Sequence, residues 1–161
     1  MKTLLLVRHA KSSHSAGFSS DFDRPLNDRG FREASEMGKK LFKNKTQIDQ
    51  FVSSPALRAK TTAELFADEY HGKMKEINFI PALYEAAPED FLDAIRDIQD
   101  NFQSIALFSH NPGITEFASS LTNTHITQMP TCSVFAVSAA VDSWKDFARS
   151  EKKFLFFYRP E

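Results

Sequence analysis

The chain has 161 residues, of which 42% are hydrophobic and 25% charged, with a formal net charge of −1. This length suits one domain, residues 1–161, which can bury roughly 70% of its unfolded surface. The near-neutral charge argues against nucleic acid or an anionic membrane as a partner. A single cysteine, Cys132, excludes an intramolecular disulfide, and the first apolar run is too short for a signal peptide or a membrane span. We therefore expect a cytoplasmic protein.

The first third of the chain predicts a strand, a loop and a helix. An apolar run at 3–7 is typical of a strand buried on both faces, and the polar segment 10–26 predicts a long loop. A helix is expected at about 28–43, because Asn27 or Asp28 can cap it. Its apolar positions recur at helical spacing: Phe31, Ala34, Met37, Leu41 and Phe42.

The remaining elements continue this alternation. They are, in chain order, a strand at 48–53, a helix begun at Pro55, a strand at 77–80, a helix begun at Pro88, a strand at 104–108, a helix begun at Pro112, and strands at 132–137 and 153–158 around a short helical stretch at 144–149. Alternating strands and helices predict an α/β fold with three layers, a mainly parallel central sheet and helices on both faces. In such sheets ligands bind beyond the carboxyl ends of the strands.

Four side chains are expected to meet at that edge of the sheet: Arg8, His9, Arg58 and His110. Arginine bonds phosphate oxygens in pairs and helix N-termini add positive potential, so a phosphoryl dianion can be held without a metal or another cofactor. A neutral imidazole can attack phosphorus, and His9 is the candidate nucleophile. His110, protonated, would help both arginines to stabilise the transition state.

Five segments together resemble the histidine phosphatases, and within them the small branch of SixA-like phosphohistidine phosphatases. They are LLLVRHAKS at 4–12, DFDRPLNDRGFREA at 21–34, SSPALRAKTTAEL at 53–65, LYEAAPEDFL at 83–92 and LFSHNPGI at 107–114. The resemblance implies a phosphoglycerate mutase-like fold and a metal-independent phosphatase that acts on a phosphorylated substrate, such as a protein that carries phosphohistidine. It also implies that His9 is the nucleophile, Arg8 and Arg58 are phosphate ligands, and His110 is the second histidine.

The general acid is the least defined part of this resemblance. Glu85 lies closest to the place where the wider family has its acid, and Asp23 and Glu89 are the alternatives. Ala10 stands where many members have glycine, which weakens an inference toward phosphoglycerate mutase chemistry. Because the nitrogen of phosphohistidine leaves more easily than an alkoxide, a weak acid still permits P–N cleavage.

Loop residues can add to substrate binding. Ser12 and Asn111 are candidates to donate hydrogen bonds to the phosphate. The connection from Ile80 to Pro88 is too short for a substantial lid, so we expect a crevice open to a side chain of another protein. Both this openness and the ease of P–N cleavage favour phosphohistidine over sugar phosphates.

Competing functions predict different residues. A cysteine phosphatase needs arginine six residues after its nucleophile, but Ser138 stands there relative to Cys132, which we expect to be a core residue of a strand. A metallohydrolase would have to use residues without a closely spaced ligand motif, namely His9, His14, Asp21, Asp23 and His110. The same pocket could also belong to a noncatalytic module that binds phosphate or a phosphoprotein, which measured turnover would exclude.

Overall fold

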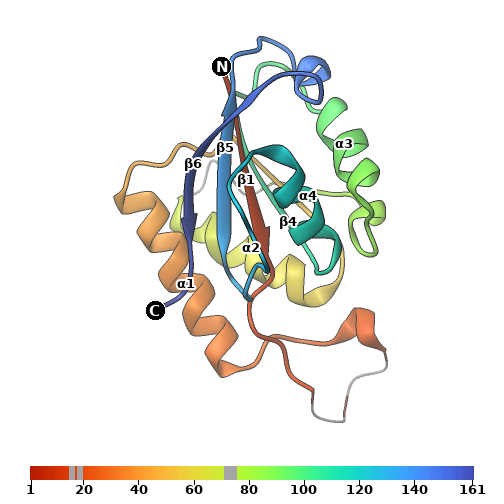
Figure 1. The fold of residues 1–161 in the computed structure, drawn as a ribbon. Helices are drawn as coiled ribbons and strands as arrows, with labels where there is room; N and C mark the ends of the chain where they lie inside the picture. The colour runs from red at the N-terminus through yellow and green to blue at the C-terminus, as the bar shows by residue number, and fades with distance from the viewer. Residues whose placement is uncertain (15–16, 18–19, 71–75) are drawn as a thin grey trace.

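The computed structural model describes residues 1–14, 17, 20–70 and 76–161, and its helices and strands alternate as predicted (Figure 1). The elements are β1 (Lys2–Arg8), α1 (Asp28–Lys43), β2 (Gln50–Ser53), α2 (Leu57–Glu69), β3 (Ile77–Phe79), α3 (Pro88–Arg96), β4 (Ser104–Ser109), α4 (Gly113–Leu121), β5 (Val134–Ala139) and β6 (Lys152–Tyr158). Short 3₁₀ turns lie at η1 (Asp21–Asp23), η2 (Pro81–Leu83) and η3 (Trp144–Asp146).

The strands form one sheet in the order β3-β2-β4-β1-β5-β6. The pairs β2–β3, β2–β4 and β1–β4 are parallel, whereas β5 runs antiparallel to both β1 and β6. The prediction of a mainly parallel sheet is thus confirmed. Arg8 is in register with Ser109, and Ser53 with Phe108, so β1, β2 and β4 end at one edge of the sheet.

Alternate residues of β1 point into two separate hydrophobic clusters. Leu4 and Leu6 belong to the cluster that α3 and α4 cover, and Leu5 and Val7 to the cluster under α1 and α2. A strand sends successive side chains to opposite faces, so an unbroken apolar run is what a sheet covered on both faces requires. This is the predicted three-layer arrangement, with α1 and α3 on opposite sides of the sheet in Figure 1.

Helix α1 has the predicted bounds but not the predicted apolar face throughout. The side chain of Asn27 caps it by accepting the amide of Gly30 at 2.8 Å. Ala34, Met37 and Leu41 are buried as expected. Phe31 and Phe42, however, are 46% and 45% exposed, because they lie on the margins of the stripe that faces the sheet.

Element boundaries differ from the predictions by a few residues in other places. Helix α2 begins at Leu57, so Pro55 precedes it rather than occupying its first turn. Cys132 is buried in the core but lies two residues before β5, with a left-handed φ of 61° and an amide that faces the carbonyls of Arg8 and His9 at 3.0 Å. The prediction that Cys132 is a strand residue is therefore wrong. No helix within the described ranges is both long and apolar enough to span a membrane.

Candidate active site

His9 follows the last residue of β1 and its ring is held in one orientation. Nδ1 lies 2.7 Å from the carbonyl oxygen of Ala10, which can only accept, so Nδ1 carries the proton and Nε2 carries the lone pair. The backbone of Ala10 is fixed in turn, since its amide donates to Thr62 Oγ1 of α2 at 2.9 Å. This arrangement leaves Nε2 as the nucleophilic atom.

Arg58 lies one residue into α2 and faces that nitrogen. Its Nε donates to His9 Nε2 at 3.3 Å. Its Nη1 donates to the backbone oxygen of Asp21 at 2.8 Å, and its Nη2 to the Asp21 carboxylate at 3.1 Å. The guanidinium thus lies between the histidine and an acidic side chain from η1, with two of its five N–H groups still available.

His110 follows β4 and packs against His9, with 5.1 Å between the ring centroids. Its Nε2 lies 2.8 Å from Ser54 Oγ. Ser54 Oγ also accepts the amide of Ala56, so this serine ties the His110 ring to the start of α2. Among the described residues Nδ1 has no hydrogen-bond partner, although it is fully buried.

Arg8, at the end of β1, also has a buried nitrogen without a hydrogen-bond partner among the described residues. Its Nη1 donates to the carbonyl of Met129 at 3.0 Å, but its buried Nε has no partner in the described part of the chain. A buried donor without an acceptor costs about 1–3 kcal/mol, so such groups call for an explanation. Arg8 Nε and His110 Nδ1 both lie at the edge of the sheet where β1 and β4 end.

Both histidines are neutral at neutral pH in the free protein. Burial, joined by nearby positive charges including Arg58, lowers the pKa of His9 to about 3 in spite of its bond to Ala10. Burial and Arg58 also lower the pKa of His110 to about 3. Burial and the neighbouring arginines therefore disfavour a protonated His110 before a substrate binds. A bound phosphate dianion would offset those charges and raise its pKa.

The acidic side of the site is built by Asp21 and Tyr84. The Tyr84 hydroxyl donates to Asp21 Oδ2 at 2.6 Å. This bond and the Arg58 guanidinium hold the pKa of Asp21 at about 2, so the carboxyl is ionised at neutral pH. The Tyr84 ring also meets the His110 ring edge-on, with centroids 5.5 Å apart. Asp21 bonds Arg58 and Tyr84 packs against His110, so this pair joins the Arg58 side of the pocket to the His110 side.

Arg58, His110, Asp21 and Tyr84 open into a cavity of about 550 Å³, whereas Arg8 and His9 do not line it. It is lined by Asp21, Arg58, Tyr84, Glu85, Ala86, His110, Asn111, Pro112 and Gly113. Four of the predicted site residues thus line one cavity: Arg58, Glu85, His110 and Asn111. Arg58 links His9 to this cavity. The exposed Glu85 is at this hollow, whereas neither Asp23 nor Glu89 lines it. Of the three acids considered from the sequence, the geometry retains Glu85.

The two tentative phosphate donors already have protein partners. Ser12 is buried and accepts a hydrogen bond from Arg24 at 2.5 Å. The side-chain amide of Asn111 donates to the Met129 carbonyl at 3.2 Å and its oxygen accepts from Thr115 at 2.6 Å. Asn111 still lines the cavity, but Ser12 does not. Ser12 instead bonds Arg24, which pairs with Asp21 at the cavity wall.

Four residues of this arrangement were not among the predicted catalytic or substrate-binding residues. Ser54 and Thr62 orient the two histidine-bearing segments, and Asp21 and Tyr84 form the outer wall. Ser54 stands at a strand end in the sequence, and that position was a usable signal. Asp21 was considered only as a metal ligand, because nothing in the sequence indicates that η1 packs against α2.

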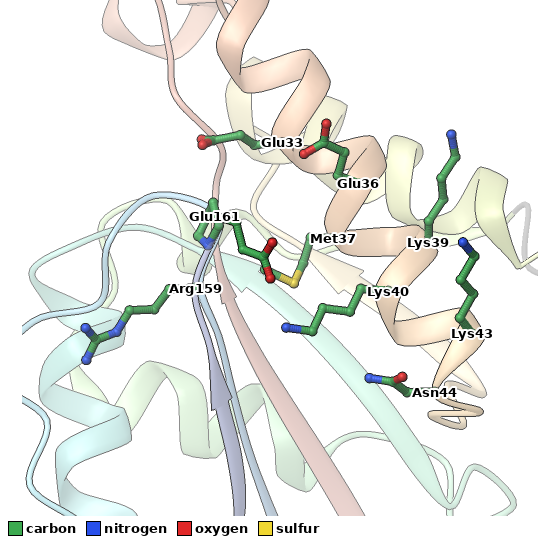
Figure 2. A pocket seen from close by; sticks show the side chains of 10 residues that line it. Glu33, Glu36, Met37, Lys39, Lys40, Lys43, Asn44, Arg159 and Glu161 are labelled. Atoms are coloured by element: carbon green, nitrogen blue, oxygen red, sulfur yellow. The ribbon is translucent and has the colours of Figure 1, made fainter.

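A second hollow lies between α1 and residues 159–161 (Figure 2). It measures about 370 Å³ and mixes charges of both signs, including Glu36, Lys40, Arg159 and Glu161. The Lys40 ammonium already lies over the Tyr158 ring at 4.1 Å.

Within the described ranges, no three His, Cys, Asp or Glu side chains are grouped so that they could hold a metal ion. The pocket at the strand ends is therefore the candidate active site.

Comparison with known proteins agrees with this geometry. The model of the histidine phosphatase superfamily (branch 1) matches residues 4–92 of the chain. An uncharacterised protein of Mycobacterium leprae is 30% identical over 166 residues, which cover 96% of this chain and 99% of that protein.

Two solved structures have the same fold over nearly the whole chain. A protein of Agrobacterium tumefaciens assigned as the phosphohistidine phosphatase SixA has a TM-score of 0.80 and 24% identity, and the match covers 99% of each chain. The protein histidine phosphatase SixA complexed with tungstate has a TM-score of 0.81 and 21% identity, with 96% of this chain and 95% of that chain covered. At these identities the likeness establishes a shared fold.

Proposed function

Because the chain belongs to the histidine phosphatase superfamily, we propose that it hydrolyses phosphoryl groups through an intermediate phosphorylated on His9, and that its substrate is phosphohistidine in another protein. One observation carries the proposal: the buried, unpartnered nitrogens of Arg8 and His110 lie at the same edge of the sheet as the nucleophilic nitrogen of His9. A phosphoryl group supplies the acceptors that these nitrogens lack.

The first step follows from the tautomer of His9. The hydrogen bond from Arg58 Nε to Nε2 breaks and the lone pair of Nε2 forms a bond to phosphorus. The bond from phosphorus to the leaving group breaks, and its electron pair stays with the leaving group. The His9 ring becomes positively charged, and the carbonyl of Ala10 stabilises the proton that remains on Nδ1. In the second step water attacks phosphorus, His9 leaves as a neutral ring, and dihydrogen phosphate is released.

The charged neighbours stabilise the phosphoryl group during both steps. Arg8 and Arg58 bind its oxygens, and His110 donates from Nδ1. Asn111 and, through Arg24, Ser12 complete the binding region. Because arginines supply the positive charge, the proposal includes catalysis without a metal. For a phosphomonoester, Glu85 at the cavity is the proposed acid for the leaving oxygen.

A protein substrate fits the form of the site. The cavity lies at the sheet edge, and the connection between β3 and α3 contains only the short turn η2 and a few further residues. A histidine side chain of another protein can therefore enter the cavity beside Arg58 and His110 without the opening of a lid. A cytoplasmic location belongs to the same proposal.

The proposal is tested by trapping the intermediate. Protein quenched during turnover of acetyl phosphate, with a chelator present, is expected to carry an acid-labile, alkali-stable phosphoryl group on His9 by mass spectrometry. His9→Ala should abolish both turnover and adduct, and His125→Ala serves as the control because His125 is exposed and bonds only to Thr127 among the interactions described. Turnover without a trapped adduct would show direct attack by water instead.

The substrate is tested with a phosphohistidine peptide and its phosphoserine counterpart. We expect the phosphohistidine peptide to have the higher kcat/KM by at least about 100-fold, because its nitrogen leaves more readily. Equal values would contradict the proposed substrate. Binding of both peptides without turnover would favour the noncatalytic module.

A further inference from the structure

The carboxylate of Asp21 stands at the mouth of the site and is held by three donors. Oδ2 accepts from the Tyr84 hydroxyl at 2.6 Å and from Arg58 Nη2 at 3.1 Å, and Oδ1 accepts from Arg24 Nε at 3.3 Å. An ionised carboxylate offers roughly four acceptor positions, so one remains. The Asp21 side chain is 56% exposed and lines the same cavity as His110. The remaining acceptor position is therefore accessible to a bound substrate.

Flat aromatic surfaces stand beside this carboxylate. The Phe22 ring meets the Tyr84 ring edge-on, with 5.2 Å between centroids, and Phe22 is 37% exposed. An exposed aromatic side chain next to an anion suits a planar, positively charged ring, which can pack against the aromatic face while its N–H donates to the carboxylate. A protonated imidazole has this combination of shape, charge and donor.

Such a contact would help an imidazole leaving group to depart from phosphorus. An imidazole bonded to phosphorus through one nitrogen leaves as an unstable anion unless its other nitrogen is protonated. When that second nitrogen carries a proton, breaking the P–N bond returns the electron pair to a positively charged ring, which departs as neutral imidazole. No proton has to reach the bond that breaks. A carboxylate that accepts the N–H of the second nitrogen therefore replaces a general acid.

We propose, on the basis of the function proposed above, that Asp21 determines specificity by binding the protonated far nitrogen of an imidazole leaving group. The electron pair of the P–N bond moves to the leaving ring as His9 Nε2 bonds to phosphorus. The proton on the far nitrogen stays in place throughout, held by Asp21. The Ala10 carbonyl does the same for the proton of His9 when that ring leaves in the second step.

The charge of Asp21 also discriminates against other phosphoryl compounds. It neutralises part of the field of Arg58 and Arg24, and it repels a dianion that brings no compensating positive charge. In a solvated site, a unit charge within about one Debye length changes the affinity for a dianion by about 3- to 10-fold. Asp21 should therefore weaken the binding of inorganic phosphate and of simple phosphomonoesters, and a cationic leaving group offsets this penalty.

The test compares Asp21→Asn with the unaltered protein on two small substrates, N-phosphoimidazole and p-nitrophenyl phosphate. Neither leaving group needs Glu85, since one departs as imidazole and the other as a weakly basic phenolate. We expect the ratio of kcat/KM for N-phosphoimidazole to that for p-nitrophenyl phosphate to fall by at least about 10-fold. Inorganic phosphate, measured by calorimetry, should bind about 3- to 10-fold more tightly.

The matched control is Asp93→Asn. The Asp93 carboxylate also pairs with an arginine, Arg96, at 2.9 Å, but it lies on α3 outside the cavity, so both measurements should stay as in the unaltered protein. An unchanged substrate ratio in Asp21→Asn, or phosphate binding that does not tighten, overturns the role of Asp21. The proposed function fails by a different result, which is the lack of a phosphoryl adduct on His9 in the unaltered protein.

Discussion

Replacing Thr62 by valine should reveal how strongly the fold holds the nucleophile in place. The Thr62 hydroxyl accepts the buried amide of Ala10 at 2.9 Å and donates to the Arg58 carbonyl at 2.7 Å. Valine has nearly the same shape, so the substitution mainly leaves the Ala10 amide without an acceptor. Such a buried, unsatisfied group costs about 1–3 kcal/mol of unfolding free energy. In a chain of this size each kcal/mol lowers Tm by about 2–4 °C.

Thr61 provides a close control. Its hydroxyl also donates to the carbonyl four residues earlier, at 2.8 Å, but it lies at the surface and accepts no amide among the described residues. Urea unfolding should show a change within about 0.5 kcal/mol for Thr61→Val. Because the Ala10 carbonyl orients His9, we also expect kcat to fall about 10-fold in Thr62→Val alone. Equal losses in both variants, or a fully stable and active Thr62→Val protein, would refute the reasoning.

One further substitution and a pH titration test other parts of the structure. Gly113→Ala should lower both stability and activity, because the added Cβ would clash with the backbone oxygen of Ala86 and the cavity wall would have to shift. A normal melting temperature and normal kinetics would contradict this contact. Lowering the pH from 6.5 toward 4.5 should also destabilise the protein. His9 and His110 bind a proton near pH 6.5 in the unfolded chain but only near pH 3 in the folded chain, because their folded pKa values are lowered. Each histidine should therefore lower the unfolding free energy by up to about 1.4 kcal/mol per pH unit. Urea unfolding of His9→Gln and His110→Gln should show a shallower dependence on pH, whereas His125→Gln should follow the unaltered protein.

Much of the fold could be predicted because its signals are local. The unbroken apolar run of β1 requires burial on both faces, and the cap at Asn27 starts α1 where it was expected. The errors arose where burial depends on a neighbouring layer. Phe31 and Phe42 satisfy helical spacing, yet they lie on the margins of the stripe that faces the sheet and stay partly exposed. Cys132 is apolar and buried, but backbone donation to the end of β1 takes it out of the strand pattern.

The sequence by itself indicated the two arginines and two histidines of the site. Arginine and histidine at strand ends indicated phosphoryl chemistry, because parallel strands end at a common edge of the sheet. Only the tertiary structure decided which atom of each ring is available and what surrounds it. The tautomer of His9 depends on the Ala10 carbonyl, the neutrality of His110 on burial beside Arg58, and the position of Asp21 on a turn that packs against α2. These are interactions between segments far apart in the chain, and local sequence patterns do not encode them.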